Sequence, residues 1–299
     1  MENRPGCVHV SDLPEEIRPR LLAGTPGIRA MVRAVGNNAG LTRMGVWLRT
    51  VQPGDAGTAR HFHTVEEEWA YVLSGQATLR IGPHRIDVRR GSFAGFPPGP
   101  APHHFLATGS EPLVLLEGGE RRPDEDTGMY PDLGFRWGPG IREKTDEPPP
   151  PKIGERSQCL HTGDLEPREF LHPVDSRAKR AFRALHEPTG LTRQAVRWVR
   201  VARGDFSTAF HTHDRTDEWV YVLSGKAHVR VGDGHFDAGP GDFLAHAAGG
   251  PAHSMQALTD LEYLMGGMID PDDVVLYPHA GLMRKHGELV PIGWARSFA

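Results

Sequence analysis

The chain has 299 residues, enough for two ordinary domains or for one large domain. Charged residues make up 24% of the chain and its net charge is -4, so we expect no basic surface for nucleic acid or for an anionic membrane. No apolar run approaches the roughly 20 residues of a membrane span, and the first residues contain no apolar signal segment. A cytoplasmic protein with a small-molecule substrate is therefore expected.

Three residue types narrow the fold class and the chemistry further. Only Cys7 and Cys159 are present, which argues against a disulfide framework and against a four-cysteine zinc cluster. The 17 histidines are more informative, because histidine is the commonest metal ligand and the usual proton carrier near pH 7. The 36 glycines and 26 prolines indicate many tight turns, as in an all-β domain.

The first half of the chain begins with a segment of helical periodicity and continues as short strands. The helical segment is expected within residues 11–22. Apolar or alternating runs then occupy residues 44–51, 68–75, 77–82, 84–88, 105–109 and 112–119. Turn signals separate them every eight to twelve residues or so, a spacing typical of a sandwich or barrel. Each half is therefore predicted to be all-β, a double-stranded β-helix or jelly-roll barrel.

An internal repeat shows that the second half is built like the first. The sequence GLTR at 40–43 returns at 190–193, and EWAYVLSG at 68–75 returns as EWVYVLSG at 218–225, 150 residues later in both cases. The segment CVHVSDLPE at 7–15 answers CLHTGDLEP at 159–167, with an offset of 152. A second helical segment is accordingly expected within residues 164–171. So long a period indicates a duplicated domain rather than a solenoid.

Four consecutive prolines separate the two copies. Residues 148–151 are predicted to form a stiff, extended linker, because proline lacks a backbone N–H and favours the polyproline conformation. We therefore place an N-terminal domain at residues 1–147 and a C-terminal domain at residues 152–299.

Histidines and a glutamate cluster at strand starts in both copies. Two histidines spaced two apart on a strand point to the same face, a glutamate opens the next strand, and a third histidine arrives from a later one. Three imidazoles and a carboxylate buried together would be costly without a cation. The predicted metal ligands are His61, His63, Glu68 and His103 in the first copy, and His211, His213, Glu218 and His253 in the second.

Neighbouring carboxylates are interpreted differently. Only Glu68 among three adjacent glutamates is matched by a glutamate in the second copy. The residues between the ligands are interpreted as solvated loop carboxylates: Glu66, Glu67, Asp214 and Asp217. An inactive or empty site in one of the two copies remains an alternative to two working sites.

The sequence resembles a bicupin of the cupin superfamily. The stretches HFHTVEEEWAYVLSG and HTHDRTDEWVYVLSG follow the first family motif, and the second motif is matched by Gly91, Pro97, Gly99 and His103. In the second copy Gly241, Gly249 and His253 match, Ala247 replaces the proline, and the usual asparagine is Ala107 or Ala257. The resemblance implies two tandem cupin barrels, a divalent metal in each, and a dimeric assembly.

The predicted ligand set occupies four positions around a metal and leaves two open. Mixed imidazole and carboxylate ligands suit Fe(II), Mn(II), Ni(II) or Zn(II). We expect Fe(II) first, because the similar bicupin dioxygenases use iron, and Mn(II) next, because the similar oxalate decarboxylases use manganese. One metal per domain is expected.

Three functions remain open. The first is a non-haem Fe(II) dioxygenase acting on a small oxygen-rich or aromatic substrate, with Phe62, Phe93, Phe96 and Phe105 as predicted pocket residues. The second is an oxygen-independent isomerase, lyase, decarboxylase or cyclase, for which His246 is the candidate catalytic residue for proton transfer. The third is a bicupin that binds a small molecule without turnover.

Overall fold

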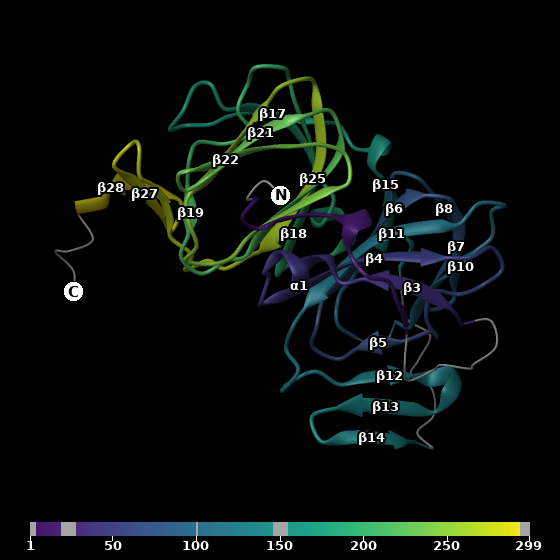
Figure 1. Cartoon of the computed structure of the whole chain (residues 1–299). Coiled ribbons are helices and arrows are strands. Elements are labelled where there is room, and N and C mark those ends of the chain that lie inside the picture. Colours follow the sequence, from purple (N-terminus) through teal and green to yellow (C-terminus); the bar gives the residue numbers. More distant parts are fainter. Residues whose placement is uncertain (1–3, 19–27, 100, 146–154, 294–299) are drawn as a thin grey trace.

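The computed structural model describes residues 4–18, 28–99, 101–145 and 155–293. The predicted proline linker at 148–151 lies outside the described residues. Two halves of the same architecture lie side by side in Figure 1, and each is built almost wholly from strands. All ladders between named strands of the described part are antiparallel. The prediction of two tandem jelly-roll barrels is confirmed.

Each half has a large sheet of seven strands. The order in the first half is β15-β9-β6-β11-β4-β3-β2 and in the second half β1-β23-β20-β25-β18-β17-β16. The strands of the first are β2 Glu16–Arg18, β3 Ala30–Arg33, β4 Met44–Val51, β6 Glu68–Ser74, β9 Ser92–Phe96, β11 Leu113–Glu120 and β15 Cys159–His161. Those of the second are β1 Cys7–His9, β16 Arg168–Leu171, β17 Lys179–Ala184, β18 Gln194–Val201, β20 Glu218–Ser224, β23 Asp242–His246 and β25 Leu261–Met268.

Two smaller sheets complete each half. A three-stranded sheet forms the opposite wall of each barrel, from β7 Gln76–Ile81, β8 His84–Arg89 and β10 His103–Ala107, and from β21 Ala227–Val231, β22 Gly234–Ala238 and β24 His253–Ala257. A four-stranded sheet extends from each barrel, made of β5 Phe62–His63, β12 Gly128–Tyr130, β13 Phe135–Gly138 and β14 Ile141–Lys144, and of β19 Thr212–His213, β26 Val275–Tyr277, β27 Leu282–Lys285 and β28 Glu288–Pro291.

The two halves exchange their first strands. Strand β1 pairs with β23 of the second half, with Cys7 opposite Leu244, and β15 pairs with β9 of the first half, with Cys159 opposite Ala94. Sheet pairing therefore crosses the sequence position where we place the domain boundary. The limits 1–147 and 152–299 stay a prediction, and each barrel wall contains a strand from the other copy.

A continuous apolar core joins the halves. Trp69 of β6 and Trp219 of β20 stack at their centre, with ring centroids 5.1 Å apart and planes 14° from parallel. Both indoles are fully buried. Gly118 gives Trp69 its space, because a Cβ at that position would lie 2.5 Å from the indole ring. Burial of such large rings is a major source of stability, so the halves form one packed unit.

Over their described residues the two segments predicted to be helical are extended instead, and residues 19–22 of the first lie outside the described part. Residues 10–12 and 162–164 form single 3-10 turns, and β2 and β16 follow them. Pro167 lies directly before β16 and Pro14 two residues before β2, where proline does not continue a helix. The α-helix of the described residues is α1, Val35–Ala39. Three further 3-10 turns of this part lie at residues 131–133, 156–158 and 187–189. No helix of the described part is long and apolar enough to cross a membrane.

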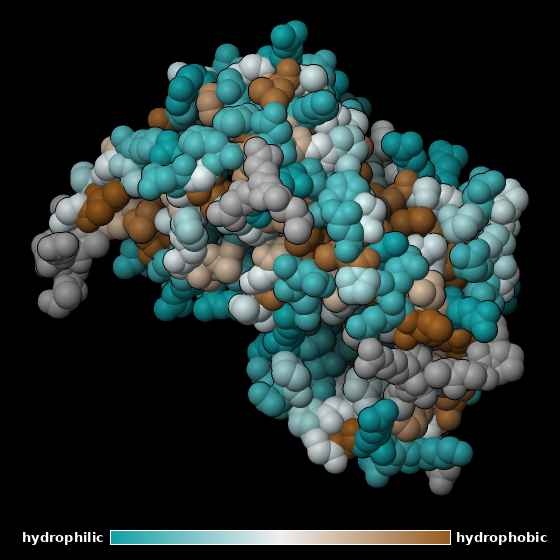
Figure 2. All heavy atoms as spheres, viewed as in Figure 1, coloured by the Kyte–Doolittle hydropathy of each residue, from teal (hydrophilic) through white to brown (hydrophobic). Residues whose placement is uncertain are grey.

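Figure 2 shows one face of the molecule. Hydrophilic residues cover most of both halves from this side, and hydrophobic ones are scattered between them. Exposed large apolar residues such as Ile17 and Leu171 belong to different segments of the chain. The barrel interiors and the seam between the halves therefore hold most of the apolar side chains.

Candidate metal centres

The four predicted ligands of the first half converge on one point. His61 precedes β5, His63 ends it, Glu68 opens β6 and His103 opens β10. The Nε2 atoms of His61, His63 and His103 lie 3.4, 3.4 and 3.3 Å from Glu68 Oε2. That oxygen is buried and has no hydrogen-bond partner. Three imidazole nitrogens thus surround one carboxylate oxygen at nearly equal distances.

The second half repeats the arrangement. The Nε2 atoms of His211, His213 and His253 lie 3.4, 3.8 and 3.1 Å from Glu218 Oε2. In both halves an antiparallel bridge joins the first and the third histidine, His61 to His103 and His211 to His253. The repeat in the sequence therefore places the same four side chains in the same geometry twice.

Hydrogen bonds at Nδ1 orient most of these rings. His61 faces the carbonyl oxygen of Ala59 at 3.0 Å, and His211 faces that of Ala209 at 2.9 Å. An Nδ1–H that donates to a carbonyl leaves the Nε2 lone pair free for the centre, which is how metal-binding histidines are held in proteins.

Two aspartates complete this orienting shell, and sequence reasoning missed both. Asp126 Oδ2 lies 2.6 Å from His63 Nδ1, and Asp273 Oδ2 lies 2.5 Å from His213 Nδ1. A signal was present, because an aspartate is followed four residues later by a tyrosine in both copies, Asp126 with Tyr130 and Asp273 with Tyr277. The offset there is 147 rather than 150 residues, so the fixed 150-residue comparison did not align them.

The pKa values of the histidines within one centre differ. Burial lowers the pKa of His103 and of His253 to about 4. Burial acts the same way on His63, but Glu68 and Asp126 outweigh it and raise its pKa to about 9. His63, His103 and His61 hold the pKa of Glu68 well below its usual range although burial opposes this. Each glutamate is therefore an ionised carboxylate, and each centre contains one histidine with a lowered pKa and one with a raised pKa.

The donor set fits a divalent cation. Ligand atoms about 2.1 Å from one ion and adjacent on an octahedron lie about 3 Å apart, close to the 3.1–3.4 Å found here for most pairs. A cation would also supply the partner that Glu68 Oε2 lacks. The fold and these residue groups suggest a divalent metal, and the assignment of each ligand stays a prediction.

The comparisons with known proteins agree with this geometry. A family model described as the cupin domain matches residues 47–118 and again residues 197–265. The chain is a bicupin of the cupin superfamily. No curated protein matches it closely enough to count as a relative.

Solved structures share the whole fold of the bicupin. Oxalate decarboxylase from Lactobacillus farciminis, in a formate complex, is 16% identical with a TM-score of 0.59 and covers 98% of this chain and 90% of that one. Oxalate decarboxylase from Bacillus subtilis at pH 4.6 is 18% identical, with a TM-score of 0.57 and coverage of 100% and 81%. The E. coli protein Ylba is 13% identical, with a TM-score of 0.58 and coverage of 89% and 92%. At these identities the likeness concerns the fold alone.

The N-terminal centre of the bicupin opens into a cavity of about 470 Å³ with aromatic walls. Its one guanidinium, Arg49, is neutralised by Glu117 through bonds of 2.5–2.9 Å. The aromatic lining residues beyond the ligands are Trp47, Trp69, Phe96, Phe105, Tyr130 and Trp137. Such a cavity suits an apolar or aromatic molecule.

The C-terminal centre opens into a smaller cavity of about 260 Å³ with cationic walls. Arg180, Arg197 and Arg284 line it, and Glu218 is the one carboxylate in its wall. Arg180 Nε is buried without a hydrogen-bond partner. No ion pair is found for these three arginines among the described residues. The positive charge of this cavity is therefore available to an anion.

The arginines stand where the first half has apolar residues. Arg197 occupies the fourth position of β18, as Trp47 does in β4, and Arg284 occupies the third position of β27, as Trp137 does in β13. Arg180 corresponds to Ala30 by the register of β17 on β18 and of β3 on β4. The duplication has thus kept the predicted ligands of the two centres and changed the walls around them.

Two of the four predicted pocket phenylalanines lie elsewhere. Phe96 and Phe105 line the N-terminal cavity. Phe62 is absent from that lining because it sits between His61 and His63 on a strand, where side chains alternate between faces. Phe93 points away from the barrel interior and stacks on Trp69, with centroids 6.3 Å apart, in the core between the halves.

His246 lies directly against the C-terminal ligand set. Its ring stacks on His253 with centroids 3.5 Å apart and planes 2° from parallel, as the ring of Phe96 stacks on His103 in the first half. It shares a small cavity of about 20 Å³ with Glu218, Tyr263 and Arg180. Its role in proton transfer stays a prediction.

The interpretation of the loop carboxylates was wrong for two of the four. Glu67 and Asp217 are only 1% exposed. They are stable in this position because backbone N–H groups of the opposite half donate to them. Glu66 also accepts a bond, from Arg122 N at 2.6 Å, whereas Asp214 is exposed.

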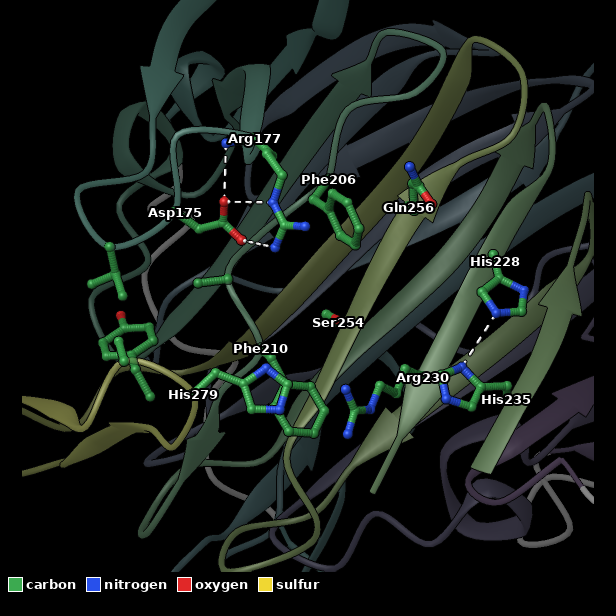
Figure 3. Close-up of a pocket in the computed structure, with 14 residues that line it drawn as sticks. Asp175, Arg177, Phe206, Phe210, His228, Arg230, His235, Ser254, Gln256 and His279 are labelled. Atoms are coloured by element: carbon green, nitrogen blue, oxygen red, sulfur yellow. Dashed lines mark hydrogen bonds and ion pairs between the residues drawn. The ribbon is translucent and has the colours of Figure 1, made fainter. Parts of the chain in front are cut away.

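A third cavity of the bicupin contains none of the predicted ligands. It measures about 600 Å³ and lies over the outer face of β21, β22 and β24 (Figure 3). His228, Arg230 and His235 face it from the small sheet, and the Arg177–Asp175 pair lies at its edge. Phe210 also lines this cavity, and its counterpart in the first half is Arg60, which is paired with Asp132. The cavity is open solvent-facing space, separate from the metal donors.

Proposed function

We propose that the chain is a metal-dependent enzyme whose C-terminal centre converts a small carboxylate in an oxygen-independent lyase or decarboxylase reaction. The observation that carries the proposal is the convergence of Arg180, Arg197 and Arg284 on the cavity beside Glu218. Guanidinium groups bind carboxylates through paired hydrogen bonds, and three of them in about 260 Å³ favour a compact acid. Two oxalate decarboxylases share the fold, which agrees with this substrate class.

The arginines would orient the substrate, and the walls would exclude bulk water. In a decarboxylation the C–C bond breaks, CO₂ leaves, and the electron pair left on carbon takes up a proton. His246 is our candidate for that proton transfer because its ring borders the small cavity that reaches Glu218. A divalent metal held by His211, His213, Glu218 and His253 would supply Lewis-acid polarisation of the substrate oxygen atoms.

An anaerobic assay tests the proposal. The chain, loaded with Mn(II) or Fe(II), is incubated with small mono-, di- and hydroxycarboxylates, and product formation is followed by NMR. Arg197→Trp copies the residue of the first half, so the barrel should tolerate it, and it should raise KM at least about tenfold, the effect of losing one charge-assisted contact. Turnover that requires O₂, or Arg197→Trp kinetics equal to those of the unaltered chain, would refute the proposal.

The aromatic walls of the N-terminal cavity favour a second candidate function. We propose that this centre, with Fe(II), is a dioxygenase site for an apolar or aromatic substrate, bound between Phe96, Phe105 and Trp137. The test is oxygen consumption by the iron-loaded chain with diols and diketones, with His61→Ala as the inactive control. No consumption with any of them, under conditions that load the centre, would contradict this second function.

Metal analysis tests the number of centres. We propose one metal in each half, so His61→Ala and His211→Ala should each lose one equivalent per chain. An unaltered chain that holds a single equivalent at saturation would show that one centre is empty.

A further inference from the structure

Each half holds the residue that precedes the predicted carboxylate ligand of the other half. Glu67, next to Glu68, accepts backbone hydrogen bonds from Thr192 at 2.9 Å, Arg193 at 3.0 Å and Gln194 at 3.1 Å. All three donors belong to the second half. The carboxylate of Glu67 is thereby anchored in a turn that lies 125 or more positions away in the chain.

The reciprocal contact is present at the other centre. Asp217, next to Glu218, accepts backbone bonds from Thr42 at 3.1 Å and Arg43 at 3.0 Å. The repeated GLTR sequences at 40–43 and 190–193 are therefore the two loops that bind these buried carboxylates. The repeat that first indicated a duplication has a defined role at the seam between the halves.

The side chain of Gln194 contacts both residues that flank the predicted ligand Glu68. This side chain is fully buried; Nε2 donates to the carbonyl oxygen of Glu67 at 2.6 Å, and Oε1 accepts from Trp69 Nε1 at 3.0 Å. Glu68 lies between these two residues. Both chain neighbours of the predicted ligand are thus bound by a single side chain from the opposite half.

The C-terminal centre lacks the two side-chain hydrogen bonds that Gln194 makes at the N-terminal centre. The first position of β4 is Met44, fully buried where β18 begins with Gln194. Methionine has no N–H to donate and is only a weak acceptor, and Trp219 Nε1 is buried without a hydrogen-bond partner. The two halves therefore allow the same position to be compared with and without these hydrogen bonds.

We infer that Gln194 is a positioning residue for Glu68, so that the C-terminal half sets part of the metal affinity of the N-terminal centre. A metal ligand binds well only when its backbone and side chain are held near the productive geometry by surrounding contacts. The inference rests on the ligand roles of the proposed function and is independent of the reaction that either centre performs.

The test measures Mn(II) affinity, not turnover. In full-length chains carrying His211→Ala, so that the N-terminal centre alone binds metal, free Mn(II) is titrated by electron paramagnetic resonance with and without Gln194→Met. We expect about tenfold weaker binding, the lower end of the effect of outer contacts on metal affinity. Methionine is the residue of the equivalent position, so the fold should be retained, and thermal unfolding with circular dichroism checks this.

Two comparisons separate positioning from general destabilisation. In a His61→Ala background Gln194→Met should change the Mn(II) affinity of the C-terminal centre by less than about twofold, and Met44→Gln should tighten it by giving Trp219 Nε1 an acceptor. Unchanged affinity at the N-terminal centre, or equal weakening at both centres, would overturn the inference. Failure of the carboxylate assay alone would leave these binding results intact.

Discussion

Replacing Asp126 by asparagine tests the orienting shell directly. Asp126 Oδ1 accepts from Val65 N at 2.8 Å and Glu66 N at 3.1 Å, and Oδ2 lies 2.6 Å from His63 Nδ1. Asparagine keeps one oxygen for the backbone donors but presents an amide N–H to the ring. The ring then favours the tautomer with its proton on Nε2, which faces the metal donors. Loss of one charge-assisted bond, about 1.5–3 kcal/mol, corresponds to roughly 10- to 150-fold weaker metal binding.

Protons compete with the metal for His63, so the loss of metal affinity in Asp126→Asn depends on pH. Burial lowers the pKa of His63, but Glu68 and Asp126 outweigh burial and raise it to about 9 in the metal-free protein. Metal binding must therefore release a proton at lower pH, and affinity should rise by up to about tenfold per unit between pH 7 and 9. Asp126→Asn lowers that pKa, so its affinity should level off at lower pH, and the full loss should be seen at pH 9.

Anaerobic Mn(II) titrations from pH 7 to 9 in the His211→Ala background measure both effects. Asp132→Asn is the control, since that carboxylate pairs with Arg60 and contacts no predicted ligand. In the His61→Ala background, Asp273→Asn should act on the C-terminal centre in the same way, because Asp273 Oδ2 holds His213 Nδ1 at 2.5 Å. Affinity of Asp126→Asn equal to that of its background at pH 9 would show that Asp126 does not orient a metal ligand.

Three further outcomes are expected. Burial raises the pKa of Cys7 to about 12 and of Cys159 to about 11. Thiol labelling at pH 8 should therefore be at least about a hundredfold slower in the native than in the unfolded chain. Rapid labelling of the native chain would contradict the burial of both thiols. Asp217→Asn should lower the free energy of unfolding in urea by about 2–3 kcal/mol, because the Asp217 carboxylate accepts backbone bonds from Thr42 and Arg43. The exposed control Asp233→Asn should lower it by less than about 0.5 kcal/mol, and equal losses would argue against the anchoring role of Asp217. His246→Phe, which copies Phe96, should abolish turnover of carboxylates with metal content unchanged, and full activity would remove His246 from the mechanism.

The jelly-roll fold and the convergence of the ligands could be predicted because both depend on local spacing. Residues two apart on a strand share a face, so His61 and His63 had to point together, and the same periodicity places Phe62 on the other side. The alternating runs also located β4, β6, β7 and β11 closely. These features need no knowledge of distant partners.

The exchange of first strands could not be predicted for a physical reason. Cys7–His9 and Cys159–His161 resemble each other, and so do the edges formed by β9 and β23. Either strand could pair with either edge on sequence grounds, because the ladder uses backbone groups that every residue offers. The choice depends on the path of the chain between elements, which sequence spacing does not encode.

Glu67 and Asp217 show a similar limit. A carboxylate in a loop beside other carboxylates is ordinarily solvated, since burial of an unpaired charge is costly. Here the partners are backbone N–H groups of residues 192–194 and 42–43, contributed by the other copy. Backbone donors leave no mark in the sequence beyond the GLTR repeat itself, so the burial could be found only from the structure.

The two centres share the contacts that join the halves but differ in the walls of their cavities. Between the halves the predicted ligands, the GLTR loops and the stacked Trp69 and Trp219 are alike, and the loops and the two tryptophans lie at the seam. The cavity walls differ in charge, with Trp47 and Trp137 on one side and Arg197 and Arg284 on the other. If both centres bound the same molecule, one set of walls would be mismatched to it, because an arginine cluster without an anion repels itself and an aromatic wall offers a carboxylate no donor. We therefore propose that the two centres bind different small molecules within one shared framework.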